Sequence, residues 1–257
     1  MGSLIIIWRK RTIRPCVRLR EGLLELIEEP LGFYVKRIPT PFEVKKAFYR
    51  QIKNSLLTEE DVRRLNLTSI GRISKLLYFD ICVKPSSEML RRFKKTLKKA
   101  REEGLPRLYV REKPSSEVFR DLSKVWVEGI AVERCLLRDL CKTVEGTLFQ
   151  TSSECVVSRS FKNDFGVRAG SFLEFEEDGR LKVSGIIEPR EGLPISFSLA
   201  VDVKLARKIP GYTHLLIKNV QRPLVVMEKL RSLHFHEIEY SIVNIGAAGW
   251  NSTHQFQ

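Results

Sequence analysis

The segment from Glu154 to Lys208 alternates apolar and polar residues with a period of two, which is typical of half-buried β-strands. At its centre, Asp178-Gly179 separates the alternating runs SFLEFEE and RLKVSGII. An Asp-Gly pair between two such runs is a strong hairpin signal, because both residues tolerate positive φ. The segment therefore predicts a β-rich region whose strand register is set by this hairpin.

The first 150 residues mix both kinds of pattern. Short apolar runs predict strands in residues 1–39 and a strand over 74–84. Helical spacing predicts a helix over 40–56, a short helix starting at Thr58 with Asp61 in its cap, and a long helix starting at Ser87. We expect a strand over 106–112 and a helical region over 116–142, on which Val118, Leu122, Val125, Trp126 and Ile130 share one side. The fold class that follows is α+β, with a mixed N-terminal lobe before the β-rich region.

The remaining residues predict a strand at THLLIKNV, a short helix over 223–231, a strand at HFHEIEYSIVNI and a turn-rich tail around Trp250. Apolar surface on this last strand and tail is expected to serve a partner.

The charge balance points to a polyanionic partner. Lys and Arg number 45 against 31 Asp and Glu, which gives a formal net charge of +14 at pH 7. Nucleic acid is the first candidate, and an anionic membrane is the second. The chain has no lipidation signal, and no apolar run approaches the ~20 residues that span a bilayer. We therefore expect nucleic-acid binding without membrane attachment.

The cysteines indicate a reducing compartment. They number five, an odd count, and form no Cys-x-x-Cys pair. Isolated thiols of this kind are typical of the cytoplasm, where we expect the protein to reside.

Two patterns could belong to metal sites. Asp202-x-Lys204 resembles half of a metal-dependent nuclease site, but the nearest upstream acids, Asp178 and Glu188, are poorly placed for rigid ligands. His234-x-His236 puts two imidazoles on one strand face without a visible third ligand. The sequence also has no phosphate-binding glycine loop and no nucleophile elbow. We therefore expect no enzyme activity, no metal and no cofactor.

Three basic clusters are candidate nucleic-acid contacts. The first lies on the polar face of the helix from Ser87, and the second interleaves with Phe161 and Phe165 in VVSRSFKNDFGVR. Basic residues beside aromatic ones suit phosphate contacts with occasional base stacking. The third follows the strand that ends at Asp202. The candidate residues are Lys94, Lys98 and Arg101; Arg159, Lys162 and Arg168; and Lys204, Arg207 and Lys208.

An ordered set of motifs over roughly residues 116–209 resembles the Argonaute and Piwi family. In that family a segment of the form vGRsFF is followed by strands and then by a strand ending L-x-x-D-V-S-H-K-V. Here Arg159, Ser160 and Phe161 match the first element, and Leu199, Asp202, Val203 and Lys208 match the last. The sequence departs from the family at Ser158, which replaces a glycine, and at Lys204-Leu205, which replaces Ser-His.

The resemblance implies three regions: an N-like α+β domain over 1–150, a β-rich region like linker L1 over 151–209, and an L2-like segment over 210–257. Only 48 residues follow Ile209, too few for a PAZ domain of roughly 100 residues and a second linker. In this family the matching aspartate is not catalytic. The resemblance therefore implies a non-catalytic subunit that pairs with a short MID–PIWI Argonaute as a heterodimer in prokaryotic defence. Its other partners would be a guide RNA and a target DNA.

Two alternatives remain open. The first is a stand-alone DNA-binding accessory protein with no obligate partner. The second is a metal-dependent nuclease that uses Asp202 and Lys204.

Overall fold

The computed structural model describes residues 3–9, 14–27, 55–64, 66, 72–102, 125–190, 196–220, 224–226, 228, 238–246 and 249–255. The N-terminal elements are the strands β1 (Ser3–Arg9), β2 (Cys16–Arg20) and β3 (Leu23–Leu26), helix α2 (Glu59–Arg64), strand β4 (Arg72–Lys84) and helix α3 (Ser87–Glu102). The middle elements are β5 (Val125–Val132), α4 (Arg134–Leu140), β6 (Cys141–Gly146), β7 (Glu154–Ser158), α5 (Arg159–Phe165), β8 (Phe172–Phe175), the 3-10 helix η3 (Glu176–Asp178) and β9 (Arg180–Pro189). The last are β10 (Leu199–Asp202), the 3-10 helix η4 (Val203–Ala206), β11 (His214–Val220), β12 (Ile238–Gly246) and β13 (Gly249–Gln255).

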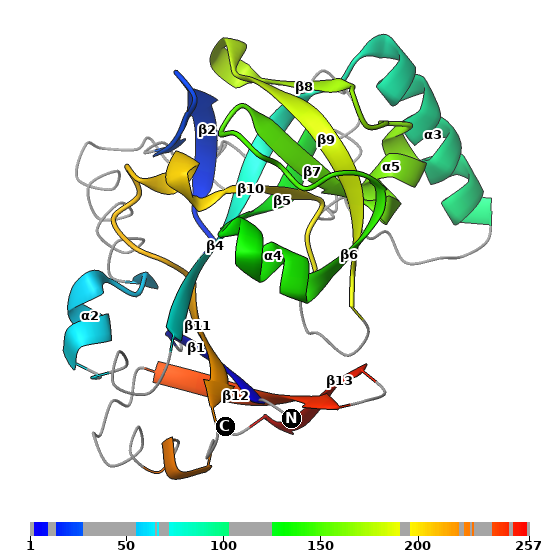
Figure 1. Ribbon diagram of the computed structural model, residues 1–257. Helices are drawn as coiled ribbons and strands as arrows, with labels where there is room; N and C mark the ends of the chain where they lie inside the picture. The colour runs from blue at the N-terminus through cyan, green and yellow to red at the C-terminus, as the bar shows by residue number, and fades with distance from the viewer. Residues whose placement is uncertain are drawn as a thin grey trace, which may run out of the picture.

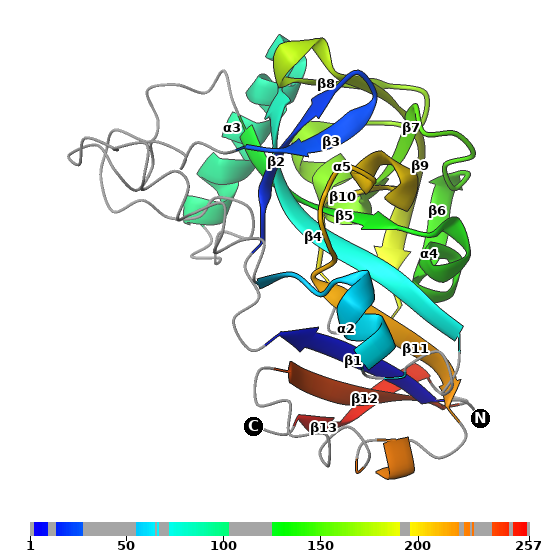
Figure 2. The same ribbon diagram turned by 90° about the vertical axis from the view of Figure 1, so that its left-hand side faces the viewer.

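The strands join into one curved sheet. Its order over the described residues is β13-β12-β1-β11-β4-β5-β10-β7-β9-β6. The β2–β3 hairpin joins this path through β4, and β8 pairs with both β4 and β9 (Figures 1 and 2). With its helices the protein is therefore a mixed helix-and-strand fold that is rich in sheet, as the α+β prediction stated.

Strand β1 belongs to the first predicted region but pairs with two strands of the last one. β1 lies between β11 and β12, so residues from both ends of the chain pair side by side (Figure 2). Nothing in this pairing tests the division into regions 1–150, 151–209 and 210–257, which stays a prediction.

The hairpin at Asp178-Gly179 is confirmed. β8 and β9 pair antiparallel, with Phe172 opposite Lys182 and Glu174 opposite Arg180. Asp178 adopts the left-handed conformation with φ of 62°, whereas Gly179 has an ordinary φ of −63°. The turn thus places its positive φ on an aspartate, a residue enriched in that conformation.

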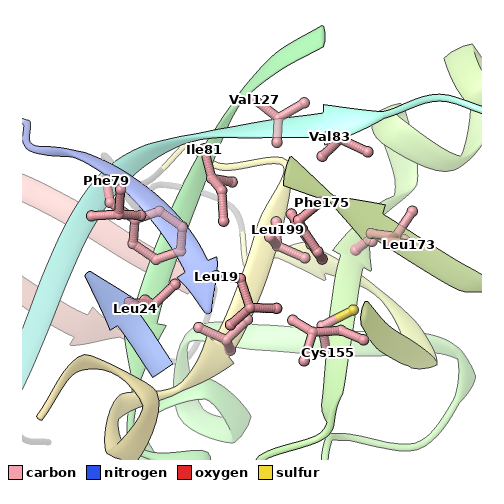
Figure 3. Close-up of a cluster of buried hydrophobic side chains, with 14 of the residues drawn as sticks. Leu19, Leu24, Phe79, Ile81, Val83, Val127, Cys155, Leu173, Phe175 and Leu199 are labelled. Atoms are coloured by element: carbon pink, nitrogen blue, oxygen red, sulfur yellow. The ribbon is translucent and has the colours of Figure 1, made fainter. Parts of the chain in front are cut away.

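The main core is built from side chains of β2–β5 and β7–β10 together with helices α3 and α5. Phe79 and Ile81 of β4, Leu173 and Phe175 of β8, and Leu24 of β3 point into it (Figure 3). A second apolar cluster packs beneath α4 through Leu136, Leu137 and Leu140. A third joins β1 and β11 to Val62 of α2. Because α3 and α5 both pack on the main core, their positions are fixed relative to each other.

Two predictions about helices are also confirmed. The long helix begins at Ser87 as expected. The capping box of the short helix is also present: the Thr58 amide donates to Asp61 Oδ2 at 2.8 Å, and the Asp61 amide donates to Thr58 Oγ1 at 3.3 Å.

Three predictions of secondary structure are wrong. Within the helical region expected over 116–142, Val125–Val132 form the strand β5, and among its described residues helix begins at Arg134. The run VWVEGIAV is largely buried between β4 and β10, so its apolar residues fit either period and periodicity alone could not decide. The helix α5 interrupts the predicted strands, and the tail around Trp250 is the strand β13 rather than turns.

Several predicted elements lie outside the described residues. They are the helix over 40–56 apart from its last residues, the strand over 106–112, the part of 116–142 before Val125, and the pair His234 and His236. No helix among the described residues is both long and apolar enough to cross a lipid bilayer.

Candidate nucleic-acid interface

Aromatic packing brings the first two basic clusters together. The rings of Phe93 on α3 and Phe165 on α5 stack with centroids 4.7 Å apart and planes 12° from parallel. The ring of Phe161 also lies against that of Phe165, with the two centroids 4.6 Å apart. Helix α3 and helix α5 therefore lie side by side at one end of the sheet (Figure 1).

Helix α3 presents a basic face to solvent. Met89 and Phe93 are buried on its inner side, whereas Lys94, Lys95 and Lys98 are exposed. Lys98 lies 3.9 Å from Glu102, and Lys94 and Lys95 form no ion pair within the described part of the chain. The predicted Arg101 belongs to the last turn of the helix.

One carboxylate binds two arginines of this helix. Glu88 binds Arg92 Nε at 2.8 Å and Arg91 Nε at 2.9 Å. The hydrogen bond from Arg92, followed by that from Arg91, lowers the pKa of the Glu88 carboxyl below its usual value. Two guanidinium groups on one carboxylate leave a net positive charge at the start of the face.

The second cluster follows β7 because Ser158 ends the strand and caps the helix. Its hydroxyl accepts a hydrogen bond from the Phe161 amide at 3.1 Å. Arg159 is therefore the first helical residue, exposed and 3.3 Å from Glu188 of β9. Ser158 thus has a capping role here.

Glu145 of β6 organises the rest of this cluster. Its carboxylate binds the ammonium group of Lys162 and accepts a hydrogen bond from the Ala169 amide at 3.2 Å. These two contacts, in that order, lower the pKa of Glu145. Arg168 is exposed beside this pair, and its charge also favours the ionised carboxylate.

The ion pairs of Arg159 and Lys162 do not prevent contact with phosphate. Both pairs are partly exposed, and exposed ion pairs contribute about 0–1 kcal/mol to stability. An incoming phosphate with bidentate geometry can replace such a carboxylate.

The predicted stacking of bases on Phe161 and Phe165 is wrong. Each ring is only 1% exposed, because both pack into the main core. An aromatic residue that does reach the surface in this part of the molecule is Phe172, which is 47% exposed. The guanidinium carbon of Arg180 lies 3.7 Å from the centroid of its ring.

Sequence reasoning missed Phe172 and Arg180, although the signal was present. In SFLEFEE the buried positions are Leu173 and Phe175, so the alternation turns Phe172 outward. The hairpin at Asp178-Gly179 then sets which residues lie opposite. Extending the alternation through the hairpin would have placed Arg180 and Lys182 on the same outward face as Phe172.

The third cluster lies elsewhere. β10 runs antiparallel to β7, with Leu199 opposite Val157 and Val201 opposite Cys155. Arg159 follows the end of β7, whereas η4 follows the opposite end of the neighbouring β10. The third cluster is therefore separated from α5 by the length of these strands.

At this end the basic residues lie beside the β2–β3 hairpin. Lys204 and Arg207 are exposed, and Lys208 forms an ion pair with Glu25 of β3. The hydrogen bond from Lys208 is the largest cause that lowers the pKa of Glu25.

Asp202 has a structural partner in this region. Its Oδ1 accepts a hydrogen bond from the Lys204 amide at 2.9 Å and thereby caps η4. Asp178 occupies the exposed hairpin turn, and Glu188 is paired with Arg159. Within the described ranges, no group of three or more His, Cys, Asp or Glu side chains is placed to hold a metal ion.

Comparisons with known proteins add little. No protein-family profile and no curated protein matches the chain. Among solved structures, it is similar to a domain of a protein described as a permease from Porphyromonas gingivalis. The TM-score is 0.40 with 8% sequence identity, covering 100% of this chain and 91% of the other. A likeness of this size carries no argument about fold or function.

Proposed function

We propose that this chain is a non-catalytic subunit that pairs with a short MID–PIWI Argonaute and helps it hold a guide RNA and a target DNA. In this proposal residues 1–150 correspond to an N-like domain, 151–209 to linker L1 and 210–257 to an L2-like segment. The ordered motifs around Arg159 and Asp202 and the net charge of +14 support it.

The observation that carries the proposal is the stacking of Phe93 on Phe165. It places the basic face of α3 beside Arg159, Lys162 and Arg168, the segment that bears the family resemblance. Two clusters far apart in the sequence thus lie on neighbouring elements, and we propose that they act together as one basic surface. A surface of this kind suits the phosphates of a duplex, whose sequence is specified by base pairing and not by the protein.

The role of Asp202 as a cap supports a non-catalytic interpretation of the Asp202–Lys204 pair. A nuclease would need its carboxylate free to bind a metal together with a second carboxylate. Here one oxygen is engaged by the Lys204 amide.

The test is co-expression of the tagged chain with the MID–PIWI protein encoded in the same genome. We expect a 1:1 complex that binds a guide RNA paired to a complementary DNA strand more tightly than either protein alone. If no stable complex forms with any MID–PIWI protein of that genome, the proposal is wrong.

The alternative is a stand-alone DNA-binding accessory protein, which the same basic surface would serve. It predicts full DNA affinity for the isolated chain and no gain on adding a MID–PIWI protein. The binding titration with and without that partner distinguishes the two functions.

A further inference from the structure

The outer face of the β8–β9 hairpin carries an aromatic ring that the core does not use. Leu173 and Phe175 fill the core, whereas Phe172 remains 47% exposed beside Arg180. An exposed phenylalanine held by a guanidinium group is a preformed platform with one ring face covered and the other open to a further planar group.

The charges along the hairpin favour an anionic strand at the Phe172 end. Lys182 lies directly opposite Phe172, and Arg168 is exposed three residues before Ser171, to whose hydroxyl its amide donates. Neither Lys182 nor Arg168 has an ion pair within the described residues.

The other end of the hairpin is acidic. Glu176 and Asp178 belong to η3 at the turn, and Asp178 approaches Lys84 at 3.9 Å. A polyanion is therefore attracted to the start of β8 and repelled from the turn. This gradient places the ligand on Phe172 and not along the whole hairpin.

The platform adjoins the basic surface of α3 and α5. The Arg92 side chain lies against Gly166, where an added Cβ atom would come within 2.3 Å of Arg92 Cδ. Gly166 ends α5 in the left-handed conformation and opens the short loop that leads through Arg168 to Phe172. A strand leaving the α3–α5 surface can follow this loop to the ring.

We propose that Phe172, supported by Arg180, stacks an unpaired base of a single-stranded nucleic acid, with Lys182 and Arg168 contacting the neighbouring phosphates. The proposal rests on the nucleic-acid-binding role proposed above and specifies one subsite within it. Every base has a stacking face, so the contact is independent of sequence. A base in a duplex is stacked on its neighbours, so only a free strand or a frayed end reaches the ring.

Arg180 acts as a positioning residue. Its guanidinium covers one face of the Phe172 ring and so leaves a single face for the base. Glu174 lies opposite Arg180 and is exposed, so it adds negative charge next to the platform.

The test compares the full-length wild-type chain with Phe172→Ala, Phe172→Leu and Phe172→Trp. The probes are a fluorescein-labelled oligothymidylate and a blunt duplex of the same strand length. We expect Phe172→Ala and Phe172→Leu to weaken oligothymidylate binding about five- to a hundred-fold, the range that loss of one base–aromatic stack gives. We expect Phe172→Trp to bind at least as tightly as wild type and duplex affinity to change less than about two-fold in all three.

A second readout isolates stacking from affinity. An oligothymidylate carrying one fluorescent adenine analogue should be quenched on binding wild type and Phe172→Trp but not Phe172→Leu. Val144→Ala removes a comparably exposed apolar side chain, 43% exposed on β6, and should leave both readouts unchanged.

The outcomes separate this inference from the proposed function. If Phe172→Leu binds and quenches like wild type, or if duplex binding falls as much as strand binding, the stacking subsite is wrong. Loss of affinity in Lys94→Gln with Lys98→Gln would then still support the basic surface. A wild-type chain that binds no oligothymidylate also overturns the subsite, whereas co-purification with a MID–PIWI protein tests the proposed function independently.

Discussion

Phe93 of α3 and Phe165 of α5 stack face to face with ring centroids 4.7 Å apart. This contact has two consequences. It fixes the basic face of α3 next to the Arg159–Arg168 segment, and it removes Phe165 from the surface where it could meet a base.

The two phenylalanines Phe165 and Phe172 should therefore respond differently to truncation. Phe165→Ala deletes a buried ring and should lower the free energy of unfolding by about 3–5 kcal/mol. Phe172→Ala removes an exposed ring and should change it by less than about 1 kcal/mol. Urea denaturation followed by circular dichroism measures both. Equal destabilisation of the two variants would contradict the different burial of these rings.

Neutralising the α3 face should alter the salt dependence of nucleic-acid binding. Lys94→Gln with Lys98→Gln removes two exposed charges, of which Lys98 lies 3.9 Å from the Glu102 carboxylate. The slope of log K against log salt should flatten by roughly 0.7–0.9 units for each phosphate that the variant no longer binds. The measurement is a salt titration of the complex with a guide–target duplex.

The matched control is Lys204→Gln with Arg207→Gln. It removes the same charge from the third cluster, which lies at the opposite end of β10. A smaller change in slope is expected, because η4 packs beside β3 of the β2–β3 hairpin and does not belong to the α3–α5 surface that is proposed to bind the duplex. If only the control flattens the slope, the interface lies on the η4 side of the molecule.

The sequence correctly predicted three features that depend on local alternation or capping. The β8–β9 hairpin, the Thr58–Asp61 capping box and the helix from Ser87 depend on local patterns, and all three are present. The strand β5 was assigned as helix because a segment buried on both faces has no polar side from which to read a period.

The nine candidate residues show a similar limit. Their basic character was readable, but their grouping depends on which end of each strand they follow. α5 and η4 belong to neighbouring antiparallel strands, and this pairing, invisible in one sequence, separates Arg159 from Lys204. Burial of Phe161 likewise follows from α5 being a helix, where spacing by four turns both Phe161 and Phe165 inward.

Asp202 should matter for stability and not for metal chemistry. Asp202→Ala removes the acceptor of the Lys204 amide and should cost about 1 kcal/mol, as the loss of a cap does. Asp202→Asn keeps an acceptor oxygen and should lie within about 0.5 kcal/mol of wild type. Thermal denaturation compares the three proteins.

The same variants test the nuclease alternative. With Mg²⁺ or Mn²⁺, the isolated wild-type chain should leave labelled DNA and RNA intact. Metal-dependent cleavage that disappears in Asp202→Asn would revive the nuclease and overturn the subunit proposal.

The imidazole of His214, which is half-buried and whose Nδ1 atom is shielded from solvent, should make stability depend on pH. It packs between the rings of Trp8 and Tyr78, its Nδ1 atom has no hydrogen-bond partner among the described residues, and burial lowers its pKa to about 4. In the unfolded chain a histidine titrates near a pKa of about 6.5. Below that value the unfolded state binds a proton that the folded state does not bind, so the free energy of unfolding falls as the pH drops from 7 towards 4.

The expected decrease from this group is about 2 kcal/mol between pH 7 and pH 5. His214→Phe removes the titration, so the variant should be destabilised about 2 kcal/mol less than wild type over the same interval. Urea unfolding of both proteins at the two pH values gives the change in the free energy of unfolding for each. Subtracting the change of the variant from that of wild type cancels the contributions of the other titrating groups. One of these is Asp164, whose pKa is raised to about 6 by burial. Parallel pH profiles for the two proteins would mean that the imidazole is protonated, or reaches solvent, in the folded state.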